Sequence, residues 1–87
     1  MKAFGLWIAL LFLSQPFTLE AQSESERYEM GLMALKEGKY TEAKKVFYQL
    51  RSQYPQNSQY WYLSGISKIQ LKDYSSALVD LNKAISI

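Results

Sequence analysis

The feature of this sequence that most constrains its fold is an internal repeat with a period of about 34 residues. A shift of this length aligns identical residues without any insertion: Tyr28 with Tyr62, Gly31 with Gly65, Tyr40 with Tyr74, and Ala43 with Ala77. Large apolar residues align as well, among them Leu32 with Ile66 and Leu35 with Ile69. A period of this size indicates two similar supersecondary units that stack on each other.

Each repeat predicts two helices, because its apolar residues recur at steps of three and four and strand alternation fits neither repeat. Gly38 is typical of a left-handed helix end, Pro55 cannot continue the helix before it, and Asn57 offers an N-cap for the next helix. The predicted helices cover residues 24–37, 40–54, 58–71 and 74–86. The sequence therefore predicts an all-α fold of two antiparallel helix-turn-helix units, a first repeat at 24–57 and a second, incomplete and uncapped repeat at 58–87.

Gly31 and Gly65 fall inside predicted helices, where glycine costs about 1 kcal/mol relative to alanine. We expect close helix packing to offset this cost, with Gly31 facing Ala43 and Gly65 facing Ala77. Four larger residues are expected to fill the space around these crossings: Tyr40, Phe47, Tyr74 and Leu81.

The repeat resembles the tetratricopeptide repeat (TPR), a helix pair with the pattern W-x₂-L-G-x₂-Y…G-x-Y-x₂-A-x₃-F…P. The matching residues are Gly31, Gly38, Tyr40, Ala43, Phe47 and Pro55 in the first repeat, and Trp61, Gly65, Tyr74, Ala77, Leu81 and Ala84 in the second. The sequence departs from the pattern at Arg27, Ala34, Ser64, Lys68 and Lys72. We interpret these departures as ordinary losses in a degenerate motif.

The resemblance implies an α-solenoid that binds proteins, in which the first helix of each repeat lines a concave surface. Two apolar triads with helical spacing lie on these helices: Tyr28, Leu32 and Leu35, and Tyr62, Ile66 and Ile69. We predict that they contact a partner peptide or helix. The alternative for Leu35 and Ile69 is that they only pack between neighbouring first helices.

The composition argues against most other functions. The chain has no histidine and no cysteine, so zinc clusters, disulfides and thiol nucleophiles are excluded. A net charge of +2 is too small for the basic face that nucleic-acid binding requires. The carboxylates are scattered, and we interpret them as solvated residues on polar helix faces. We therefore expect a non-enzymatic protein that needs no cofactor or metal and binds no nucleic acid.

The N-terminus has the layout of a signal peptide: Lys2, an apolar run from Ala3 to Leu13, and Pro16 soon afterwards. The run is about half of the roughly 20 residues that a membrane-spanning helix needs. We predict a signal peptide over residues 1–21, cleaved after Ala21, and export to the periplasm or the cell exterior. Two alternatives remain, an N-terminal helix buried in the fold and an uncleaved anchor that would make the protein a membrane-tethered accessory subunit.

The second repeat stops before its expected closing proline, and no polar capping helix follows in the sequence. Stacked repeats bury their apolar faces only against neighbours, so the C-terminal face is expected to be open. Val79, Ile85 and Ile87 are predicted to contribute to an exposed apolar patch there. Such a face indicates a fragment of a longer array, self-association, or a partner that covers it.

Overall fold

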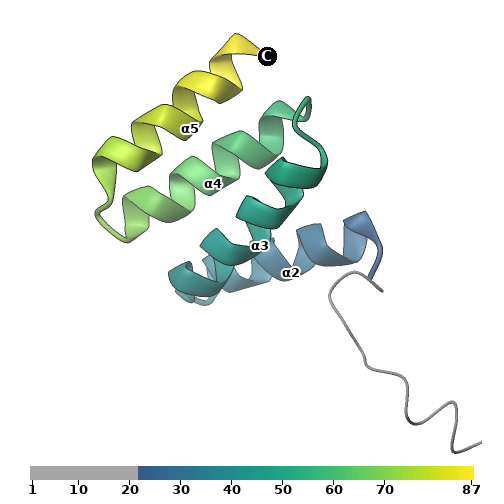
Figure 1. Cartoon of the computed structure of the whole chain (residues 1–87). Helices are drawn as coiled ribbons and strands as arrows, with labels where there is room; N and C mark the ends of the chain where they lie inside the picture. Colours follow the sequence, from purple (N-terminus) through teal and green to yellow (C-terminus); the bar gives the residue numbers. More distant parts are fainter. Residues whose placement is uncertain (1–21) are drawn as a thin grey trace, which may run out of the picture.

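The computed structural model describes residues 22–87, which form four α-helices and, within that range, no strand. The helices are α2 (Glu24–Lys36), α3 (Tyr40–Gln53), α4 (Ser58–Gln70) and α5 (Tyr74–Ser86) (Figure 1). Each boundary agrees with the predicted one to within one residue, which confirms the all-helical fold class. The predicted signal peptide, residues 1–21, lies outside the described residues.

The helix ends follow from local side-chain chemistry. Ser23 caps α2, its hydroxyl accepting a hydrogen bond of 3.1 Å from the backbone N–H three residues on. Asn57 caps α4 as predicted, accepting from a backbone N–H at 3.1 Å. Gly38 takes a φ of +77° in the turn between α2 and α3, which confirms the left-handed helix end. Lys72 has a φ of 64° in the matching turn between α4 and α5, a strained conformation for a residue with a side chain.

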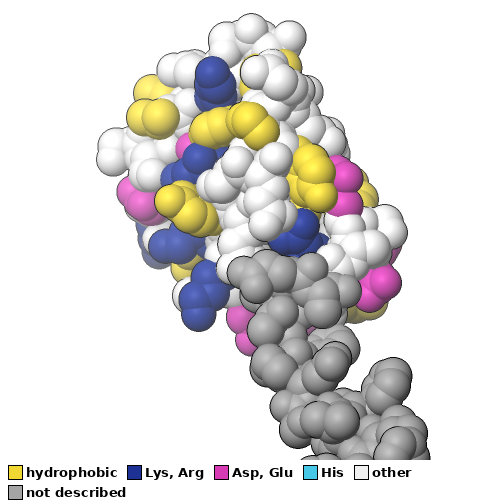
Figure 2. Space-filling view, turned by 45° about the vertical axis from the view of Figure 1, so that its right-hand side comes forward, with side chains coloured by type: hydrophobic (Ala, Val, Ile, Leu, Met, Phe, Trp, Pro, Cys, Tyr) yellow, Lys and Arg dark blue, Asp and Glu magenta, His cyan; other side chains and the backbone are white. Residues whose placement is uncertain are grey.

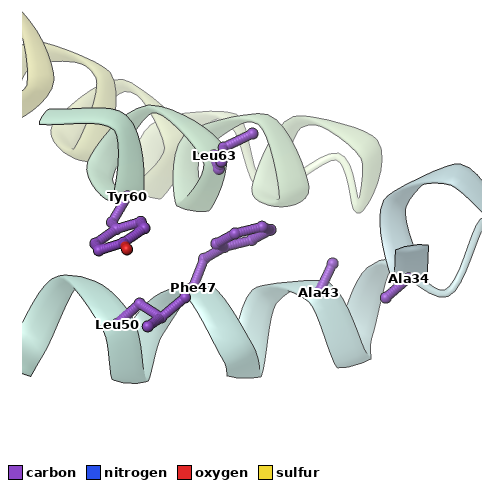
Figure 3. Close-up of a cluster of buried hydrophobic side chains, with 6 residues drawn as sticks. All are labelled: Ala34, Ala43, Phe47, Leu50, Tyr60 and Leu63. Atoms are coloured by element: carbon purple, nitrogen blue, oxygen red, sulfur yellow. The ribbon is translucent and has the colours of Figure 1, made fainter. Parts of the chain in front are cut away.

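Consecutive helices pack against each other in the order α2–α3–α4–α5. The main apolar core lies where α4 meets α2 and α3, so it joins the two repeats (Figure 3). Figure 3 shows Phe47 pointing from α3 toward α4, with Tyr60 and Leu63 on the facing helix. The buried residues of this core are Ala34, Ala43, Phe47, Leu50, Tyr60 and Leu63. The repeats are thus joined by a continuous core and share one folding unit.

Gly31 lies at the tightest contact between α2 and α3. A Cβ atom built on Gly31 would stand 2.5 Å from Cζ of Phe47. Close packing at this glycine is therefore confirmed, and its nearest neighbour across the crossing is the ring of Phe47.

Gly65 has a similar position between α4 and α5. A Cβ atom there would stand 2.8 Å from the side chain of Leu81 and 3.3 Å from the carbonyl oxygen of Ala77. The predicted approach of Gly65 to Ala77 is thus confirmed through the backbone of Ala77. Tyr74 was predicted to fill space around this crossing. This prediction was wrong, because Tyr74 is 61% exposed. No helix among residues 22–87 has the length and apolar character needed to cross a membrane.

Candidate functional site

The first triad of predicted contact residues lies partly inside the core. Tyr28, Leu32 and Leu35 are half-buried and pack against the core cluster. The ring of Tyr28 meets Phe47 edge-on at a centroid distance of 6.5 Å and lies 5.9 Å from the ring of Tyr60. These three side chains therefore contribute to the packing of α2 against its neighbours, and only part of their surface faces solvent.

The second triad is placed differently at Tyr62. Ile66 and Ile69 are half-buried, whereas Tyr62 is 47% exposed. Tyr62 borders a groove of about 510 Å³ between α4 and α5, which we call the α4/α5 groove. Its lining residues are Ser58, Gln59, Tyr62, Leu81, Ala84 and Ile85. The groove has no charged side chain in its lining and suits an apolar ligand.

Further apolar residues are exposed on α5 and at its C-terminal end. Val79, Ile85 and Ile87 are exposed, as predicted, and Leu78 is exposed as well. Figure 2 shows one face of the molecule, where hydrophobic side chains reach the surface in separate groups next to Lys and Arg.

The internal repeat shows what the α4/α5 groove would be in a longer stack. Three groove residues, Tyr62, Leu81 and Ala84, are the repeat counterparts of Tyr28, Phe47 and Leu50. Phe47 and Leu50 are fully buried, and Tyr28 packs on the same core. The helix that covers them is α4, through the two side chains Tyr60 and Leu63. The groove is thus the uncovered counterpart of an interface that the first repeat buries.

The opposite end of the molecule is the outer face of α2. It borders a hollow of about 500 Å³ lined by Gln22, Ser25, Glu26, Glu29, Met30 and Met33. In the repeat, Glu26 is the counterpart of Tyr60 and Glu29 is the counterpart of Leu63. This end therefore carries two carboxylates at the positions where α4 buries an aromatic and an aliphatic side chain.

A buried polar cluster lies between α4 and α5, and sequence reasoning missed it. Asp80 is 2% exposed, accepts from the Ser64 hydroxyl at 2.6 Å and pairs with Nζ of Lys68 at 2.9 Å. Nε of Arg51 on α3 lies 3.8 Å from the same carboxylate oxygen. The interpretation of the carboxylates as solvated was therefore wrong for Asp80. Buried charges persist only where a partner and hydrogen bonds compensate their desolvation, and here both are present.

The polar cluster also changes the interpretation of two departures from the repeat pattern. The first repeat has Met30, Ala34 and Val46 at the positions where the second has Ser64, Lys68 and Asp80. All three positions are apolar in the first repeat and polar in the second, and the three polar side chains meet. This joint change was the signal that could have revealed the cluster from sequence.

Aromatic rings hold Arg51 beside this cluster. Its guanidinium lies 4.5 Å from the ring of Tyr48 and 4.4 Å from the ring of Trp61. The indole N–H of Trp61 in turn donates to the carbonyl oxygen of Pro55 at 2.9 Å. This chain of contacts fixes α3, the Pro55 turn and α4 relative to one another.

The phenol of Tyr60 lies between α4 and α2 and has a raised pKa. Burial raises the pKa of its phenol well above the ordinary value near 10, and a hydrogen bond to the Glu24 carboxylate raises it further. The phenol is therefore a permanent donor that joins α4 to the first turn of α2.

Among residues 22–87, no group of carboxylates, cysteines or histidines is arranged to hold a metal ion. Comparisons of the chain with models of protein families, with curated proteins and with solved structures found no match. The interpretation of function therefore depends on the internal repeat and on the surfaces that the four helices leave open.

Proposed function

We propose that this protein is a non-enzymatic interaction module, built from two TPR-like helix pairs, that binds a peptide or helix of a protein partner. The observation that carries the proposal is the α4/α5 groove, an apolar surface that stays open while its counterpart in the first repeat is buried under α4. Covering such a surface stabilises a complex by roughly 25 cal/mol per Å² of apolar area, before the ordering costs of the partner.

Within this proposal the two triads of the concave face have different roles. Tyr62, Ile66 and Ile69 on α4 contact the partner, and Tyr62 contributes most because it is the most exposed of the three. Tyr28 and its two neighbours on α2 contribute the part of their surface that the core leaves open, and they mainly hold the shape of the first repeat.

We further propose that the protein works outside the cytoplasm, with residues 1–21 removed as a signal peptide. The support is the apolar run from Ala3 to Leu13 behind Lys2. The same run supports the alternative, an uncleaved anchor that holds the repeats at a membrane as an accessory subunit. Sequencing the N-terminus of the protein isolated from its host separates the two, since cleavage gives a chain starting at Gln22 and an anchor leaves Met1.

The binding function is tested by affinity capture with purified full-length protein and two single variants. Tyr62→Ala removes an exposed ring at the groove, and Met33→Ala is the matched control, an exposed apolar residue on the far face of α2. We expect the partner to bind the wild type and the Met33 variant alike and the Tyr62 variant about tenfold more weakly, because the lost apolar burial is worth about 1.4 kcal/mol. Equal capture by all three proteins would contradict the proposal.

A further inference from the structure

The interface between the two repeats is a template for what fits the α4/α5 groove. In the first repeat, Tyr28, Phe47 and Leu50 form a surface that α4 covers. The covering helix inserts Tyr60 and, three residues later, Leu63, and both become buried. One helical turn separates these two side chains, so they lie on the same face of α4.

The same surface recurs at the groove with its cover missing. Tyr62 replaces Tyr28, Leu81 replaces Phe47, and Ala84 replaces Leu50. The replacements are apolar and either equal or smaller in size, which leaves the hollow of about 510 Å³. A helix placed on α5 as α4 is placed on α3 would fill it, with two large apolar side chains pointing inward.

A second molecule of this chain is a poor occupant of the groove. If a second molecule stacked on this one as the second repeat stacks on the first, its α2 would lie on the groove. The reason is that α2 and α4 are the first helices of their repeats. This arrangement would put Glu26 where Tyr60 is buried and Glu29 where Leu63 is buried. The groove lining offers no cation to pair with either carboxylate. Burying unpaired carboxylates is strongly unfavourable, so head-to-tail stacking is disfavoured.

We propose that the α4/α5 groove binds an amphipathic helix of a protein partner whose contact face is uncharged, with an aromatic residue at one position and a large aliphatic residue three positions later. Glu26 and Glu29 prevent a second molecule of this chain from taking that place. This inference rests on the proposed binding function and names the class of partner and the surface that receives it.

The test is a fluorescence anisotropy titration of the full chain with two labelled peptides. One peptide has the sequence of residues 57–71, acetylated and amidated, and so carries the covering face of α4. The other is identical except for Tyr60→Glu and Leu63→Glu, which reproduces the acidic face of α2. We expect saturable binding of the first peptide and at least about tenfold weaker binding of the second. Absence of binding by the first, or equal binding by both, would overturn the proposal.

Two variants of the protein locate the binding surface. Ala84→Asp places a charge in the groove, and Ser86→Asp places the same charge in the same helical turn outside its lining. We expect only Ala84→Asp to weaken peptide binding. Ile85→Asp is a second groove variant, and because Ile85 is 84% exposed the substitution leaves the fold intact. Equal peptide affinity of the wild type and both groove variants would place the peptide elsewhere and contradict the proposal.

Sedimentation velocity of the wild type tests the exclusion of a second molecule. If the wild type forms chains of molecules and Ala84→Asp disperses them, a second molecule occupies the groove. This result would overturn the proposal. The peptide titration can be judged separately from the affinity capture that tests the proposed binding function. If partner capture does not depend on Tyr62 but the α4-sequence peptide binds as expected, the broader function fails and the selectivity of the groove stands.

Discussion

Replacing Asp80 with valine removes the shared acceptor of the buried polar cluster between α4 and α5. Lys68 then lies at 8% exposure without its carboxylate partner, and the Ser64 hydroxyl loses its acceptor. Removing one partner of a buried ion pair costs about 3–5 kcal/mol. A unit of roughly 66 residues has a total free energy of unfolding of about 3–10 kcal/mol. We therefore expect Asp80→Val to lose most of its stability at room temperature.

The first repeat supplies the matched rescue. It has Met30, Ala34 and Val46 at the equivalent positions, so the triple variant Ser64→Met, Lys68→Ala, Asp80→Val gives the second repeat the apolar residues of the first. Exchange of a whole buried ion pair for well-packed apolar residues is often neutral or stabilising. We expect the triple variant to return to within about 1 kcal/mol of the wild type.

The assay is urea unfolding followed by circular dichroism. With a slope of about 1 kcal/mol per molar urea for a protein of this size, a loss of 3 kcal/mol lowers the midpoint by about 3 M. Asp73→Ala is the control, because Asp73 is exposed and its side chain caps no helix, and its midpoint should hardly move. A midpoint of Asp80→Val equal to that of the control, or a triple variant no more stable than the single one, would refute the reasoning.

Three further predictions follow from the glycine contact, the buried phenol and the acidic end. Gly31→Ala should lower the melting temperature, because the added methyl group meets the buried Phe47 ring. The overpacking costs about 1–3 kcal/mol and exceeds the gain in helix propensity of about 1 kcal/mol. A melting temperature at or above the wild-type value would contradict this prediction. Tyr60 has a raised pKa in the folded protein, so its contribution to the free energy of unfolding is complete below the unfolded pKa of about 10 and is lost as the pH rises further. Between pH 9 and pH 11 the wild type should therefore lose more stability in urea unfolding than Tyr60→Phe. Equal losses would count against this prediction. Glu26→Tyr combined with Glu29→Leu gives α2 the covering face of α4, so this variant should form concentration-dependent chains in sedimentation experiments, and a monomer at all concentrations would argue against the stacking model.

The helix boundaries could be predicted from sequence because their causes are local. A glycine with positive φ at Gly38, a proline at Pro55 and a capping side chain at Asn57 each act within a few residues of the helix end. The periodic apolar residues then fix which face of each helix is buried. These signals need no knowledge of the tertiary contacts.

The polar cluster could not be predicted from one repeat alone. Lys68 and Asp80 are residue types that are usually solvated, and whether they are buried depends on how α3 and α5 cover α4. Comparison between the repeats carries the missing information, because three positions that are apolar in the first repeat are polar together in the second. Compensating changes of this kind are visible only when the positions are considered as a set.

The predicted contact surface shows a second limit of sequence reasoning. Helical spacing places Tyr28 and Tyr62 on equivalent faces, but it does not tell how deeply each is covered. Tyr28 is covered because another helix pair follows it, whereas Tyr62 borders the open groove. The neighbours of a repeat therefore decide how deeply the same residue is covered.

Trp61 offers a direct optical view of the junction between the repeats. It is the only tryptophan among residues 22–87, and its ring is in contact with Arg51 from α3 and lies 5.9 Å from the Lys83 ammonium of α5. Its indole N–H is held by the turn that links the two helix pairs. Separation of the pairs would expose the ring to water and shift its emission to longer wavelength while helicity is still intact. Residues 22–87 thus contain a single tryptophan fluorophore that distinguishes undocking of the two helix pairs from melting of the helices.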